Sequence, residues 1–198
     1  MGAVFEVDMP ALFSPGLPMS VSSVRSVVRR WEKLGVARAE PMIAHQGRLV
    51  RLTAEGAILV TDCDEDAYVA THEGFTVAVH RALVSRARLR IEGSAMAAGP
   101  VDGWMSERAW RLENAGAVSS GDYVPHGMVL LVDGDPGVVY VAHTAAELVR
   151  FRLRLAEICR RHPFVVVVAR SDLLDAAITT QLGDLAVSTG GRLEFVDL

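Results

Sequence analysis

The chain has 198 residues, of which 51% are hydrophobic and 22% are charged, so it can bury one large or two small cores, which argues against extensive disorder. Its longest apolar run in the C-terminal half, residues 164–169, is too short to cross a bilayer, and no signal peptide is recognisable, so we expect a cytoplasmic protein with no membrane partner. Two isolated cysteines, Cys63 and Cys159, argue against a disulfide framework or a thiolate zinc site.

Residues 2–17 mix apolar residues with helix breakers, which indicates a short extended arm or a single helical turn. The next stretch, residues 20–34, has the spacing of an amphipathic helix. Its apolar stripe consists of Val21, Val24, Val27, Val28, Trp31 and Leu34. Ser20 or Ser22 can cap the helix, and Gly35 can end it in the left-handed conformation. We place Trp31 in the core between this helix and the hairpin that follows.

The pattern changes after Gly35 to a β-hairpin. Residues 36–43 and 48–53 are predicted strands, with a turn at His45, Gln46 and Gly47. Thr53 then caps another helical start, with Glu55 at the positive end of its dipole. Helix followed by hairpin resembles a winged helix-turn-helix, in which the helix enters the DNA major groove and the hairpin is the wing.

Charge supports an interaction with DNA. Residues 20–51 hold seven basic and two acidic side chains, a net +5, although the whole chain carries −4. Such a segment suits a phosphate-facing surface, although a basic helix face can also be simply solvated. The predicted contacts to double-stranded DNA are Ser22, Ser23, Arg25, Ser26, Arg29, Arg30, Lys33, Gln46, Arg48 and Arg51.

An acidic segment at residues 61–66 lacks the spacing of a calcium loop and is predicted to be an exposed linker. It suggests a DNA-binding domain over residues 1–62 and a second domain over residues 70–198. Residues 71–92 have the spacing of one long helix. Its arginines are expected on the outer side, solvated rather than in a second nucleic-acid contact: Arg81, Arg86, Arg88 and Arg90.

The rest of the second domain reads as α/β. Residues 93–103 are predicted to be a loop, and Ser106 to cap a helix reaching residue 112. Strands are expected at residues 128–132, 138–142, 164–169 and 193–196, and helices after Thr144 and Ser171. This order predicts an α/β fold with a central mixed sheet and helices on its faces.

Five runs in this order resemble the actinobacterial plasmid replication-relaxation family. They are VRRWEKLGV at 28–36, RLTAEG at 51–56, VAVHRALVSRARLRIE at 77–92, GWMSER at 103–108 and VPHG at 124–127. The resemblance implies a winged helix followed by a domain similar to PD-(D/E)XK nucleases. Glu107 matches the acidic helix position of the nuclease site, but His126 stands at the aspartate position. Tyr140, Ala142 and His143 replace the acidic and basic strand residues.

One surviving oxygen ligand implies a vestigial nuclease site of Glu107, His126 and Tyr140, with no catalytic residue, metal or cofactor. The expected function is a DNA-binding regulator or accessory factor of a plasmid, phage or other mobile-element replication system. Its second domain would serve dimerisation or partner binding. Two alternatives stay open: a metal-dependent nuclease with an atypical site at Glu107, His126 and Asp133, and a protein-interaction adaptor. Asp133 and Asp135 lie in the predicted turn between two strands.

Overall fold

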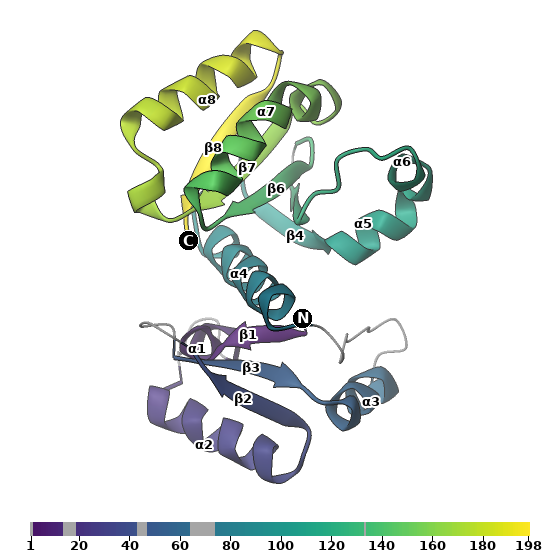
Figure 1. Ribbon diagram of the computed structural model, residues 1–198, viewed down its shortest axis with the longest axis vertical. Helices are drawn as coiled ribbons and strands as arrows, with labels where there is room; N and C mark the ends of the chain where they lie inside the picture. Colours follow the sequence, from purple (N-terminus) through teal and green to yellow (C-terminus); the bar gives the residue numbers. More distant parts are fainter. Residues whose placement is uncertain (1, 14–18, 43–46, 64–73, 133) are drawn as a thin grey trace. The chain divides into compact units, whose positions relative to one another are not determined.

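The computed structural model describes residues 2–13, 19–42, 47–63, 74–132 and 134–198 (Figure 1). The chain forms two compact units, Met1–Leu89 (unit 1) and Arg90–Leu198 (unit 2), which are described separately. The sequence placed this boundary between residues 62 and 70, whereas most of the long helix belongs to unit 1. The reason is long-range: Ser85 and Arg86 of that helix bond to Ala3 and Asp8 near the N-terminus.

Unit 1 contains a three-stranded antiparallel sheet in the order β1-β3-β2. Its elements are β1 (Ala3–Phe5), the 3-10 helix η1 (Glu6–Asp8), α1 (Met9–Phe13), α2 (Val21–Lys33), β2 (Ala37–Pro41), β3 (Arg48–Leu52), α3 (Ala54–Cys63) and α4 (Phe75–Glu92) up to Leu89. The predicted helix with its Ser20 cap, the two hairpin strands, the helix after Thr53 and the long helix are confirmed. The predicted turn residues His45 and Gln46 lie outside the described residues.

One face of this sheet packs on α2. The buried cluster consists of Met9, Val24, Val28, Ala37 and Val50. Trp31 is only partly buried against that cluster, and its ring lies edge-to-face on Phe13 with 5.7 Å between the ring centres. The prediction that Trp31 lies in the core is therefore confirmed only in part. Val21 and Leu34 were expected on the buried stripe but are exposed, because the cluster contacts only the middle of the helix.

The opposite face of the sheet packs on α4. The Ser85 hydroxyl donates to the Ala3 carbonyl at 3.2 Å, and the Arg86 guanidinium lies 4.7 Å from the centre of the Phe5 ring. Arg86 also forms an ion pair with Asp8 at 2.8 Å. The prediction that Arg86 coats the outer side of the helix is therefore wrong, because a carboxylate 78 positions away draws it against the sheet.

Unit 2 is built on a five-stranded mixed sheet in the order β4-β5-β6-β7-β8. Its elements are β4 (Val101–Ser106), α5 (Glu107–Glu113), α6 (Ala115–Ser119), β5 (Gly127–Leu131), β6 (Gly137–Ala142), α7 (Ala145–Arg161), β7 (Phe164–Ala169), the 3-10 helix η2 (Ser171–Leu173), α8 (Ala176–Ser188) and β8 (Arg192–Asp197). β4, β5 and β6 run antiparallel, whereas β6, β7 and β8 run parallel. The predicted α/β class and mixed sheet are confirmed.

Two local predictions for unit 2 are wrong. Residues 101–103 were expected in a loop but begin β4, because pairing with β5 supplies backbone hydrogen bonds that local sequence does not reveal. Ser171 is predicted to cap a helix, but its N–H donates to the Asp197 carboxylate at 2.8 Å. The cap of α8 is Asp175, whose carboxylate accepts from the Ile178 N–H at 2.7 Å.

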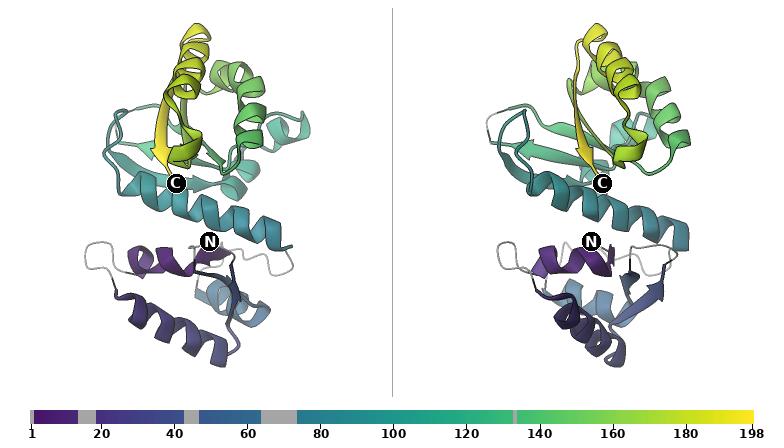
Figure 2. Two further views of the ribbon diagram at one scale, coloured as in Figure 1. Left: turned by 60° about the vertical axis from the view of Figure 1, so that its left-hand side comes forward. Right: turned by 90° about the vertical axis from the view of Figure 1, so that its left-hand side faces the viewer.

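The core of unit 2 forms around β7, whose six residues are all buried, as the uniformly apolar run predicted. Its two parallel neighbours connect through α7 and α8, which lie on the same side of the sheet (Figure 2). Val165 and Val167 pack there with Phe151 and Leu155 of α7 and Leu182 of α8. In the part of the chain that is described, no helix has the length and apolar character needed to span a membrane.

A glycine in α3 allows this helix to approach the chain that leaves α2. A Cβ atom on Gly56 would lie 1.9 Å from the Val36 carbonyl oxygen, a backbone atom. Gly56→Ala should therefore destabilise unit 1 by roughly 1–3 kcal/mol, as overpacking does. Gly183→Ala in α8 is the control, because a Cβ there meets nothing within 4 Å and alanine favours a helix by about 1 kcal/mol. Urea denaturation measures both, and an unchanged midpoint for Gly56→Ala would contradict the close contact.

Candidate nucleic-acid interface

The candidate interface is the outer face of α2. Ser20 caps the helix by accepting from the Ser23 N–H at 3.1 Å, and Val24 and Val28 are fully buried on the inner side. Positions separated by four, three and four residues then point directly away from the core. These positions hold Ser22, Ser26, Arg29 and Lys33, all exposed.

Three further predicted contacts flank this line and are also exposed: Ser23, Arg25 and Arg30. Within the described ranges, no carboxylate lies at ion-pair distance from Arg25, Arg29, Arg30 or Lys33. The structure thus gathers seven of the ten predicted DNA contacts on one helix, with four cations directed to solvent.

Arg48, also a predicted DNA contact, differs from these four cations because carboxylates hold its guanidinium. Its guanidinium forms a bidentate pair with Glu6 at 2.8 and 3.2 Å and a third bond to Glu32 at 3.1 Å. Glu6 is only 6% exposed. The hydrogen bond from Arg48 is the largest influence on this carboxyl and, against the effect of burial, holds the pKa of Glu6 below its ordinary value. Arg48 therefore acts as a clamp between β3, η1 and α2.

Arg51, another predicted contact, is also paired with a carboxylate. It is 9% exposed and bonds to Glu40 at 2.6 Å, on the sheet face away from α2. Arg38, directly opposite Arg51 on β2, reaches the same Glu40 oxygen at 3.4 Å. Three of the seven basic residues in the +5 segment are therefore neutralised by carboxylates. Gln46, the remaining predicted contact, lies outside the described residues.

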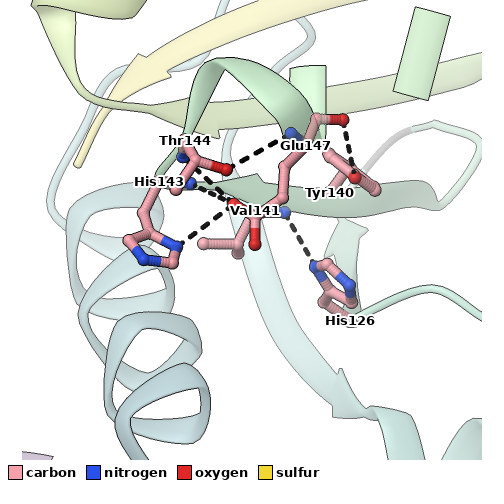
Figure 3. Close-up of polar contacts among 6 residues, drawn as sticks. All are labelled: His126, Tyr140, Val141, His143, Thr144 and Glu147. Carbon is pink, nitrogen blue, oxygen red and sulfur yellow. Dashed lines mark hydrogen bonds and ion pairs between the residues drawn. The ribbon is translucent and has the colours of Figure 1, made fainter. Parts of the chain in front are cut away.

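The residues of the predicted vestigial nuclease site have structural partners, and Figure 3 shows those of His126 and Tyr140. Glu107 forms an ion pair with Arg111 one helical turn away, at 2.8 Å. The His126 ring stacks on Tyr140 with 4.9 Å between centroids, and Tyr140 stacks in turn on Phe151 at 4.5 Å. His126 and Tyr140 thus lie side by side within an aromatic stack.

His126 supplies a hydrogen bond to β6 at Val141, a residue that has no partner in β5. Its backbone N–H donates to the Val139 carbonyl at 3.1 Å, and its Nδ1 accepts from the Val141 N–H at 2.9 Å. β5 begins one residue later, so the side chain extends the hydrogen-bond ladder beyond the strand. A ring nitrogen that accepts a hydrogen bond from an amide carries no proton, and its lone pair is used by that bond.

The N-terminus of α7 carries a capping box formed by Thr144 and Glu147, which the pattern Thr-x-x-Glu could have revealed from the sequence. Burial disfavours the charge of Glu147, but hydrogen bonds from the N–H groups of His143 and Thr144 outweigh it and keep its pKa below the ordinary value. The Tyr140 hydroxyl donates to the Glu147 carbonyl at 3.0 Å. Burial, then the nearby Glu147 charge, raises the pKa of Tyr140, which keeps this donor protonated.

Metal-ligating side chains do not cluster in the part of the chain that the structure describes: no group of three His, Cys, Asp or Glu converges there. Asp135 is exposed beyond the end of β5, and Asp133 lies outside the described residues. Comparison of the chain with models of protein families, with curated proteins and with solved structures finds no match. The resemblance to the plasmid replication-relaxation family therefore stays a prediction from the sequence.

The clamp can be tested through its pH dependence. Arg48→Ala should destabilise unit 1 by roughly 1–3 kcal/mol near pH 7, because it leaves the buried Glu6 carboxylate without its donor. A lowered pKa in the folded state contributes stability above the ordinary carboxyl value of 4.5 and loses it as pH falls. The difference in free energy of unfolding between wild type and variant should therefore become smaller below that pH. Urea titrations from pH 7 to pH 3 measure it, with Arg38→Ala as the half-exposed control. If this difference in free energy of unfolding does not change with pH, Arg48 does not act as a clamp on Glu6.

His126→Ala should leave the buried Val141 N–H without an acceptor, at a cost of about 1–3 kcal/mol. The amide of Val141 should also exchange with deuterium faster, which hydrogen-exchange NMR measures residue by residue. His143→Ala is the matched control, since its imidazole is exposed at the end of α7. Equal protection of Val141 in both variants would show that the His126 ring does not extend the ladder.

Proposed function

We propose that the protein binds double-stranded DNA through the outer face of α2, as a regulator or accessory factor of a plasmid, phage or mobile-element replication system. The observation that carries the proposal is the set of four cations on this face, none of which has a carboxylate at ion-pair distance in the described ranges. Lys and Arg side chains placed on phosphates release condensed counterions, which supplies binding energy. The replication role rests on the family resemblance alone.

The shape of the helix supports this proposal. From Ser22 to Lys33 the outer line covers about 16 Å at 1.5 Å per residue, and the major groove, about 12 Å wide, admits an α-helix. Ser22 and Ser26 interleave with the cations, and hydroxyl groups of this kind bond to phosphates and base edges. No large apolar side chain lies in the line, so little would be lost by contact with a polar duplex.

The order of elements also supports it. α2 is followed directly by the antiparallel pair β2 and β3, and β1 completes the sheet beside β3. A winged helix-turn-helix would require a recognition helix before a hairpin in this way. In this proposal Arg48 and Arg51 fix the helix and the sheet instead of touching DNA.

The test is the salt dependence of binding. Arg29→Ala with Arg30→Ala should weaken binding to a labelled DNA duplex. The slope of log affinity against log salt should fall by about 0.9 for each phosphate that the variant no longer neutralises. Fluorescence anisotropy at several salt concentrations measures both quantities.

The matched control is Arg150→Ala with Arg160→Ala, which removes the same charge from exposed positions on α7. Affinity and slope should stay at wild-type values in this control. If both double variants lose affinity equally, attraction by total charge explains the binding and the assignment to α2 fails. If neither changes it, the outer face of α2 is not the contact.

A further inference from the structure

Helix α7 has an apolar stripe on its outer side as well as on its inner side. Phe151 and Leu155 are buried against the sheet of unit 2. Val149 and Leu153, one turn apart on the other side, are 55% and 76% exposed. Ala146 and Ala156 continue the outer stripe at spacings of three residues from its two ends, which is the kind of repeat by which one helix packs along another.

Arginines border this stripe. Arg150 and Arg152 lie on its two flanks, and Arg160 lies at its C-terminal end, all three exposed. Arg152 bonds only weakly to the neutral Gln181 at 3.4 Å, and Arg160 donates to a backbone carbonyl. In the described ranges, no carboxylate lies at ion-pair distance from these three. The stripe is thus apolar along its middle, and its margins carry these three arginines and one carboxylate, Glu157, which is paired with Arg154 at 3.5 Å.

We propose that the outer stripe of α7 docks an amphipathic helix of a partner protein whose apolar positions are flanked by Asp or Glu. The apolar middle gains by burial against a second apolar stripe, and the arginines gain carboxylate partners in bidentate geometry. This surface differs from α2, because Val149 and Leu153 would be pressed against phosphates if the occupant were nucleic acid. The inference does not depend on DNA binding by unit 1.

A second copy of the chain fits the stripe less well. In an antiparallel pair that packs Val149 on Leu153, Arg150 of each copy would lie beside Arg150 of the other, and Arg152 beside Arg152. In a parallel pair, Arg160 would meet Arg160. Like charges placed directly across such an interface oppose association. One helix face is also smaller than a standard stable interface, which fits a weak, reversible contact.

The probes are two synthetic heptad peptides with Leu at the a and d positions. One carries Glu at the e and g positions and the other carries Lys. The full-length protein should bind the Glu peptide and not the Lys peptide in fluorescence anisotropy, and added salt should weaken that binding. Charge reversal by Arg150→Glu with Arg152→Glu should exchange the preference of the two peptides. Absence of binding to either peptide, or equal binding to both, overturns the proposal.

The contribution of the apolar stripe is tested by Leu153→Glu and the uncharged Leu153→Gln. Each should lower affinity for the Glu peptide by about tenfold or more, the effect of removing one buried leucine. Leu112→Glu on α5 is the matched control, since Leu112 is 69% exposed in the same unit, and it should bind as wild type. Equal loss in the control overturns the proposal. So does self-association of the wild type that Leu153→Glu abolishes in sedimentation, because the occupant is then a second copy.

Discussion

Arg48 joins the three parts of unit 1 that position the basic helix. β3 supplies the arginine, η1 supplies the buried Glu6, and α2 supplies Glu32 near its C-terminal end. A buried carboxylate is tolerated only with charged hydrogen-bond donors, so Glu6 requires Arg48 where it stands. The same contact orients α2 on the sheet, with Val24 and Val28 inward. The outward direction of Arg29 and Lys33 follows from this packing.

Helices α2 and α7 are both rich in arginine, yet their outer faces differ in chemistry. On α2 the outer line combines serines with cations. On α7 the outer line is made by Val149 and Leu153, with cations only at its margins. Phosphate groups favour the first arrangement because all contacts are polar and charged. An amphipathic protein helix favours the second because apolar area is available for burial. Charge alone does not distinguish these two surfaces.

The aromatic and polar contacts around β6 show how a residue that resembles a catalytic group can serve the fold. His126 completes the hydrogen bonding of Val141, and Tyr140 bonds to the first turn of α7. Glu147 closes that turn by accepting from two backbone N–H groups. The last two contacts hold α7 to β6, the central strand, at which the parallel part of the sheet begins. Each of these polar groups has a partner in the fold, as buried polar groups require.

The sequence alone determined the elements whose signals are local. Caps at Ser20, Ser106 and Thr144, apolar periodicity and the uniform β7 run depend on residues within a few positions, so helices and most strands were predictable. Only the tertiary structure decided the pairing of β4. It also decided that Arg48, Arg51 and Arg86 form ion pairs, because their carboxylate partners lie 42, 11 and 78 positions away in the sequence. Periodicity shows which side of a helix is polar. Which polar side chains face solvent depends on the distant segments that meet them.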